Sequence, residues 1–404
     1  YGVVGDGLRQ DILSTKLYSM TSVSTSRQVR KWIFGLAARG TVDFENFRSE
    51  LTPADSMRND IGWRRIDLSL TPSVSYSISG RFNFDVYCPT TYVDICSDDR
   101  LSSKSSCGRV ILSPVASIKW TPTYNLTIKT SANYGERLGG LYDMFGGYIL
   151  RDYRTLERRN GDWNRTRSGS GSLDLSYSNA VKAFFANVSV MSWKSRSDFK
   201  TGVNYSGLLS SRVSYHIPDE KSGVSIGANA SKRFQPIATT VKLSSEWSRS
   251  WADLIRQGMT IPAINDALTL STMVESRISN VSVLSYSGSF QSYQFRMTGV
   301  DGSGPIHTIR QTVSLNFLIG KKIIAGASCR HFYNNGISGF DRNMFFANLR
   351  LSFKHKRLEY VAEGTNLLGT KYYGTSYFSA NTTHATLYRL RPTSVTVSVR
   401  FSLK

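Results

Sequence analysis

Residues 65–86 have the sequence RIDLSLTPSVSYSISGRFNFDV. Every even position from Ile66 to Ile78 is apolar or aromatic, whereas the odd positions from Arg65 to Ser77 are polar. Because successive side chains of a strand point to opposite faces, this alternation predicts a β-strand with one apolar and one polar face. Ser79-Gly80-Arg81 then predicts a tight turn, and the alternation resumes at Phe82.

The same alternation recurs along the chain, for example over 112–120, 309–319 and 394–403. We expect tight turns near 39–40, 79–80, 121–122, 179–180, 235–236, 279–280, 320–321 and 356–357. Longer polar connections are expected at about 88–108, 136–170, 250–265, 297–306, 334–342 and 367–392. Eight turns join sixteen strands, and the stretch 394–403 adds a last strand, which makes seventeen.

Short turns and long connections therefore alternate, which is typical of a membrane-spanning β-barrel. In such a barrel the apolar face of each strand meets lipid, and the sheet must pair all of its backbone groups. We predict an all-β, antiparallel, up-and-down transmembrane β-barrel. A soluble protein built of many hairpins is the alternative. No stretch approaches the 18 or so consecutive apolar residues of a membrane-spanning helix.

The chain has 404 residues and is strongly basic, with 50 Lys and Arg against 29 Asp and Glu and a net charge of +21. Such a charge raises nucleic acid as a partner. The basic residues are scattered over alternate strand positions and connections, however, so we expect no nucleic-acid partner. Cys88, Cys96 and Cys107 are close in sequence, and a Cys88–Cys96 or a Cys96–Cys107 disulfide is conceivable in an oxidising compartment.

Motifs of catalysis and of metal or phosphate binding, such as GxSxG, HExxH and the phosphate-binding GxxxxGK[ST] loop, do not occur in the sequence. The five histidines are far apart, although His307 and His331 could meet across one hairpin. We therefore expect neither an enzyme nor a resident metal or cofactor.

The connection 136–170 combines arginines with aromatic residues. Guanidinium groups can chelate carboxylate or phosphate, and aromatic faces can stack on flat or sugar-like ligands. Its candidate ligand-binding residues are Arg151, Arg154, Arg158, Arg159, Tyr148, Tyr153 and Trp163. Two other roles for the arginines are contact with lipopolysaccharide phosphates and simple solvation of a long extracellular loop.

A family resemblance rests on the C-terminal end of the chain. Residues 363–373, EGTNLLGTKYY, resemble the Asn-Leu-(Leu/Phe)-x-x-x-Tyr-Tyr segment of TonB-dependent outer-membrane receptors. Tyr388–Pro392 and the following strand resemble the last strand of that family, and 112–122 resembles its earlier hairpins. The chain departs from the usual pattern by ending on Lys404 rather than on an aromatic residue.

The resemblance implies a barrel of 22 strands, a plug domain and an N-terminal energy-coupling segment. Residues 1–404 would then be the C-terminal part of one barrel domain, without the plug and five strands. Within it, 1–27 would be the remnant of an extracellular loop, 136–170 a long extracellular loop and 394–403 the last strand.

The resemblance also implies a function, which is energy-coupled uptake of a siderophore-, glycan- or peptide-like nutrient across the outer membrane of a Gram-negative cell. The implied partners are the bilayer with its lipopolysaccharide, an inner-membrane energy-coupling protein reached through the absent N-terminal part, and an unknown small ligand. A passive porin or a surface adhesin is the alternative.

Overall fold

The computed structural model describes residues 9–52, 58–99, 104–152, 155–159, 163–206, 209–299, 304–320, 322–337, 341–379 and 382–401. Within these ranges the regular elements are β-strands and one 3₁₀ turn. A helix long and apolar enough to cross a membrane does not occur in this part of the chain.

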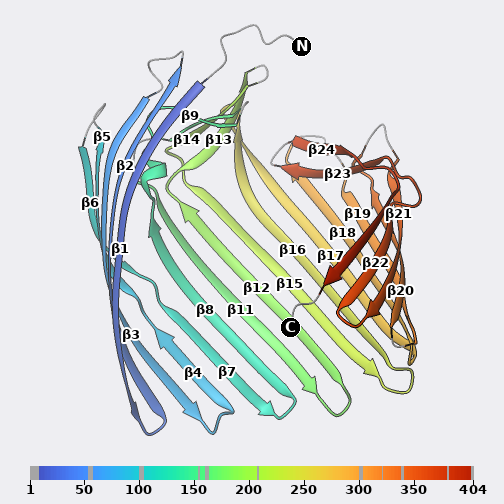
Figure 1. Cartoon of the computed structure of the whole chain (residues 1–404). Helices are drawn as coiled ribbons and strands as arrows, with labels where there is room; N and C mark the ends of the chain where they lie inside the picture. The colour runs from blue at the N-terminus through green and yellow to red at the C-terminus, as the bar shows by residue number, and fades with distance from the viewer. Residues whose placement is uncertain are drawn as a thin grey trace. The chain divides into compact units, whose positions relative to one another are not determined.

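The chain forms two compact units. Figure 1 shows their strands. Unit 1 comprises residues 1–173, 191–224 and 250–263, and unit 2 comprises 174–190, 225–249 and 264–404. The elements of unit 1 are β1 (Arg9–Val29), β2 (Trp32–Thr52), β3 (Arg58–Ile78), β4 (Phe82–Tyr87), β5 (Thr90–Asp99), β6 (Lys104–Leu112), β7 (Val115–Thr123), β8 (Leu126–Leu138), η1 (Leu141–Asp143), β9 (Ile149–Asp152), β10 (Thr155–Arg158), β13 (Lys200–Ser206) and β14 (Leu209–Tyr215). Those of unit 2 are β18 (Ser282–Met297), β19 (Ile306–Ile319), β20 (Ile323–Asn334), β21 (Asn343–His355), β22 (Leu358–Thr365), β23 (Tyr372–Ser379), β24 (Thr382–Arg389) and β25 (Ser394–Phe401). Five strands contribute residues to both units: β11 (Arg165–Asn179), β12 (Phe184–Ser197), β15 (Asp219–Phe234), β16 (Thr239–Arg256) and β17 (Met259–Ser279).

Prolines interrupt two strands without ending their course along the sheet. β3 pairs with β5 over Ile61–Leu70 and with β4 over Ser73–Ile78, and the break between β4 and β5 falls at Pro89. β6 and β7 are separated in the same way at Pro114. Because proline has no backbone N–H to donate to the ladder, it breaks the strand at these positions.

The predicted fold class is confirmed in its strands, which are antiparallel and follow an up-and-down course. Seventeen long strands result when each interrupted pair is taken as one strand and the short strands β9, β10, β13, β14, β23 and β24 are set aside. This number agrees with the count from the sequence.

Most of the predicted turns are present, but the first is misplaced. The chain turns at Arg30-Lys31 and not at 39–40, where β2 continues through Arg39 and Gly40. Residues Arg9–Arg27 consequently belong to strand β1. The prediction that 1–27 are the remnant of an extracellular loop is therefore wrong for residues 9–27, which are the part that the structure describes. Arg30 adopts a positive φ of 55° without being glycine, and for that reason the turn has no glycine signal in the sequence.

Two of the predicted polar connections are also wrong. Residues 88–108 fold mainly into the β5–β6 hairpin, and 250–265 into the ends of β16 and β17 around Gln257-Gly258. A bilayer needs only about 9–11 residues of strand, whereas β1, β2, β3 and β17 have 21 residues each. The strands therefore continue as hairpins beyond the membrane, where their composition is polar.

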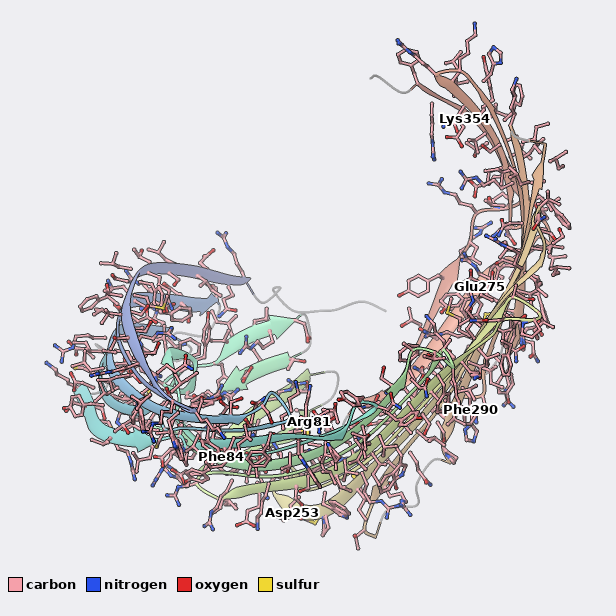
Figure 2. All side chains as sticks on the ribbon, turned by 90° about the horizontal axis from the view of Figure 1, so that it is seen from below. Arg81, Phe84, Asp253, Glu275, Phe290 and Lys354 are labelled. Atoms are coloured by element: carbon pink, nitrogen blue, oxygen red, sulfur yellow. The ribbon has the colours of Figure 1, made fainter. Side chains whose placement is uncertain are left out.

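Unit 2 presents a continuous apolar surface on one face of its strands. The registers align Phe317, Ala325, Leu351, Ala362 and Val397 in one row across β19, β20, β21, β22 and β25. Leu351 is 50% and Val397 72% exposed. Side chains project from both faces of the strands, as around Phe290 and Lys354 in Figure 2.

The opposite face of the same strands is polar. There the registers align Asn316, Gly326, Arg350, Glu363 and Thr396. Exposed apolar surface of this extent requires an apolar surrounding, and strands with one lipid-facing and one polar face are the mark of a membrane-spanning sheet.

Unit 1 repeats this arrangement and adds a buried core. Leu68 and Leu70 on β3 are exposed, whereas Ile61 and Trp63, of opposite parity on the same strand, are buried. The core therefore lies on the face opposite to the exposed apolar rows. It consists of Phe47, Ile61, Trp63, Val93, Ile95, Ile111, Leu138, Leu141, Met144, Phe145 and Ile149.

All four cysteines are free. Cys107 lies opposite Ile95 in the β5–β6 ladder, so it points to the other face from Cys96 and cannot bond to it. Cys88 and Cys96 are separated by eight residues of extended chain, which puts them out of disulfide range. Neither of the conceivable disulfides is formed.

Candidate functional site

The predicted ligand loop folds against the strands of unit 1 instead of standing free. Leu141, Phe145 and Ile149 complete the core, and Phe145 stacks on Phe47 of β2 with ring centroids 4.5 Å apart. The backbone N–H of Gly147 donates to Asn59 Oδ1 at 2.8 Å. A Cβ at Gly147 would collide with the carbonyl oxygen of Arg58, so only glycine permits this close passage.

Short strands extend the packing from this loop to neighbouring connections. β9 pairs with β10, β10 pairs in parallel with β14, and β14 pairs with β13, which meets β16 in parallel at Gly202 and Val203. Figure 1 shows β9, β13 and β14 at the end of unit 1 opposite to its tight turns. In Figure 2 the two short green strands lie on the inner side of the curve formed by the blue strands of that unit.

Trp163 does not serve as a free stacking surface. Its ring lies 5.7 Å from that of Trp63, and its Nε1–H donates to Ser105 Oγ at 2.8 Å. Because the Trp163 ring already packs against the core, these contacts compete with its predicted role of stacking on a ligand. Tyr153 and Arg154 lie outside the described residues, and their predicted role stays a prediction.

Two of the remaining candidate residues, Arg151 and Arg159, share one buried carboxylate. Glu157, 7% exposed, accepts from Arg151 Nε and Arg159 Nη2 at 2.5 Å each. Arg158 points away from this pair and lies over the ring of Tyr148, 5.9 Å from its centroid. The structure therefore brings Arg151 and Arg159 together at Glu157 and places Arg158 on Tyr148, and ligand binding by these residues stays a prediction.

Sharing of one carboxylate between two cations is repeated in unit 1. Glu136 pairs with Arg109 and Arg165, and Asp219 pairs with Lys221 at 2.7 Å and with Lys200 at 3.9 Å. Glu220 is shared by Lys194 and Arg196. The groups around Glu136 and Glu220 each carry one surplus positive charge, whereas Lys200 also pairs with Asp253 at 3.7 Å, so the group around Asp219 is balanced.

Arg165 lies at the loop end of β11, beyond the stretch of about 9–11 residues nearest the tight turn that a bilayer would enclose. Its hydrogen bond to Glu136 raises the pKa of the Arg165 guanidinium above its usual value. Arg165 therefore keeps its positive charge at any ordinary pH.

A polar cavity of about 320 Å³ adjoins the cluster within unit 1. Its lining residues are Arg137, Asp143, Arg159, Asn164, Thr166, Ser195, Ser197, Phe199, Thr201, Ser214, Asp219 and Lys221. Of these only Arg159 was a candidate from the sequence. The hydroxyl residues come from strands far apart in the chain, and no local pattern could have selected them.

The histidines and acidic residues that the structure describes are not gathered into a metal site. Among the described residues there is no group of three His, Cys, Asp or Glu side chains placed to hold a metal ion. His331 lies opposite Gln311 in the β19–β20 ladder, whereas His307 is close to Asn335, so the suggested meeting of the two histidines does not occur.

No protein-family model matches the chain, and no curated protein is similar to it in sequence. Among solved structures, the ferric yersiniabactin uptake receptor FyuA from Yersinia pestis matches 99% of this chain with 12% identity and a TM-score of 0.45. The ferric-catecholate import receptor Fiu from E. coli matches 98% with 9% identity and a TM-score of 0.32. The siderophore receptor PiuA from Acinetobacter baumannii matches 95% with 9% identity and a TM-score of 0.30.

The chain spans 63% of the length of the FyuA structure and 81% of Fiu and of PiuA. All three TM-scores are below 0.5. The assignment of the fold therefore rests on the strands, registers and exposed faces of this chain. The binding functions named for these receptors are properties of those proteins.

Proposed function

We propose that the chain is the strand-forming part of an outer-membrane receptor that takes up a small nutrient by energy-coupled transport. The observation that carries this proposal is the connection 139–164, whose described residues pack onto the core of unit 1, on the face opposite to its exposed apolar rows. A folded, arginine-rich connection at that place offers a receptor the groups that hold an anionic ligand.

The cluster around Glu157 supplies ligand-binding chemistry. Arg151 and Arg159 are held in place by a buried carboxylate, which lowers the entropy cost of presenting a guanidinium to an anion. Arg158 over Tyr148 offers a guanidinium backed by an aromatic face. In this function the ligand is anionic, the partners are the bilayer with its lipopolysaccharide and an inner-membrane energy-coupling protein, and the protein is not an enzyme.

The test is uptake by cells that carry the full-length parent gene, compared with cells from which it is deleted. The solute whose accumulation is lost on deletion is then followed with and without a protonophore. We expect uptake that stops when the proton gradient is dissipated. Uptake that survives the protonophore and rises linearly with solute concentration would contradict energy coupling and establish the porin function instead.

A further inference from the structure

The polar cavity of unit 1 has a composition that fits a defined class of ligand. Its volume of about 320 Å³ is at the lower end of the range for small-molecule sites. Its walls carry the hydroxyl groups of Thr166, Ser195, Ser197, Thr201 and Ser214. A wall so rich in groups that both donate and accept hydrogen bonds suits a ligand that is itself polyhydroxylated.

The hydroxyl groups are ordered by hydrogen bonds across the cavity. Thr166 Oγ1 and Ser197 Oγ are 3.1 Å apart, and Ser197 donates to Asn164 Oδ1 at 2.7 Å. In addition, Arg159 Nη1 donates to Thr201 Oγ1 at 3.2 Å and to Ser214 Oγ at 3.4 Å. The walls are therefore set in position before a ligand enters, which favours binding.

Two buried polar atoms in these walls lack a hydrogen-bond partner. One is the donor Nε of Arg159, and the other is the acceptor Oδ1 of Asp219, which lies 3.9 Å from Lys200 Nζ, beyond hydrogen-bond distance. Leaving a buried donor or acceptor unsatisfied costs about 1–3 kcal/mol. Both atoms are closed to solvent, so a ligand in the cavity reaches them only when the side chains of Arg159 and Asp219 turn toward it.

The lining of the cavity carries three cations, Arg137, Arg159 and Lys221, against two carboxylates, Asp143 and Asp219, and the one surplus positive charge favours an anion. Arg137 is exposed, lines the cavity and has no ion-pair partner within the described residues. Arg159 shares the single negative charge of Glu157 with Arg151, so Glu157 does not fully neutralise the Arg159 guanidinium. Guanidinium groups bind carboxylate and phosphate oxygens with charge-assisted hydrogen bonds.

We infer that this cavity binds a small hydroxylated organic anion, of the size of one acidic sugar ring. The anionic group is held by Arg137 and Arg159, and a ligand hydroxyl donates to Asp219 while others meet the serine and threonine walls. The inference rests on the proposed function, because it names the ligand class that the receptor would accept.

The test is isothermal titration of the purified protein in detergent with glucuronate, gluconate and glucose 6-phosphate, and with glucose as the neutral probe. We expect at least one of the three anions to bind and glucose to bind at least tenfold more weakly. Absence of binding by all three at millimolar concentration, or equal binding of glucose, would overturn the inference.

Matched variants separate this site from the neighbouring cluster. Arg137→Gln removes an exposed cation without an ion pair, so the fold should be unaffected, and it should weaken anion binding about 10-fold or more, as for a lost charge-assisted hydrogen bond. Arg159→Gln should act in the same direction. Arg109→Gln, which removes a cation of the same unit that pairs with Glu136 and does not line the cavity, is the control and should bind like the wild type.

The acidic sugar can be a free solute or the end of a lipid-linked glycan. Displacement of the bound anion by purified lipopolysaccharide assigns the site to a lipid-linked sugar, and lack of displacement assigns it to a free solute; both outcomes retain the site. If Arg137→Gln and Arg159→Gln bind the anion as the wild type does, the cavity is not the binding site.

The titration needs no energy source and is independent of the uptake assay. Failure to bind any of the anions, together with protonophore-sensitive uptake of another solute, would overturn the ligand class alone. Binding without energy-dependent uptake would overturn the proposed function and leave the cavity as a binding site.

Discussion

At the scale of single residues, the loop end of unit 1 is organised by carboxylates that each hold two cations. Glu157 is buried, and both of its partners, Arg151 and Arg159, are candidate ligand-binding residues. Exposed ion pairs contribute little to stability, but a buried carboxylate that accepts from two guanidinium groups fixes both of them. Glu157 is thus a positioning residue for Arg151 and Arg159.

Glu157→Gln should loosen the connection 139–164, because the two guanidinium groups lose their common anionic partner. We expect a local loss of about 1.5–3 kcal/mol, the range for hydrogen bonds to charged groups. The measurement is hydrogen exchange of β9 and β10, with faster exchange in the variant. Glu275→Gln, an exposed position in β17 without an ion pair among the described residues, is the control; equal exchange in both variants would contradict the role of Glu157.

At the scale of elements, turns and strand breaks are set by residues that the ladder cannot accommodate. Pro89 and Pro114 interrupt long strands, and Gly80 and Gly320 adopt positive φ values of 66° and 64° at tight turns. At Gly80 a Cβ would meet nothing within 4 Å, so its requirement for glycine is conformational and not steric crowding.

Gly80→Ala should lower the free energy of unfolding by about 1–2 kcal/mol, the cost of a left-handed conformation for a residue with a Cβ. Urea unfolding of the protein in detergent micelles measures this change. Gly146→Ala serves as the control, since Gly146 also has open space around its Cβ position but no positive φ. A similar loss in the two variants would show that the turn conformation is not the cause.

At the scale of the whole molecule, the alternation of faces decides which surface meets lipid. Val397 and Thr396 are neighbours on β25 and point to opposite faces, Val397 opposite Ala362 and Thr396 opposite Glu363. The first belongs to the exposed apolar row of unit 2 and the second to the polar row. Neighbouring residues of one strand therefore should differ sharply in their tolerance of charge.

Val397→Arg should destabilise the protein in a bilayer by about 2–4 kcal/mol, the cost of an arginine on a lipid-facing position near the midplane. Thr396→Arg should be tolerated, since it faces polar residues and adds a cation beside Glu363. Folding into lipid vesicles, followed by heat-dependent gel migration, compares the two. Equal tolerance of both substitutions would show that this surface does not face lipid.

The sequence alone determined the all-β class, the number of long strands and most of the turns, because period-two alternation and turn residues are local properties of the chain. The sequence did not locate the turn at Arg30, because that turn lacks glycine. The hairpin ends in 88–108 and 250–265 were predicted as loops, because beyond the bilayer neither face of a strand must be apolar. The docking of Phe145 on Phe47, the sharing of Glu157 by Arg151 and Arg159, and the hydroxyl-lined cavity were decided by the tertiary structure. Strand pairing sets these contacts between residues that are tens of positions apart, where sequence spacing carries no information on distance.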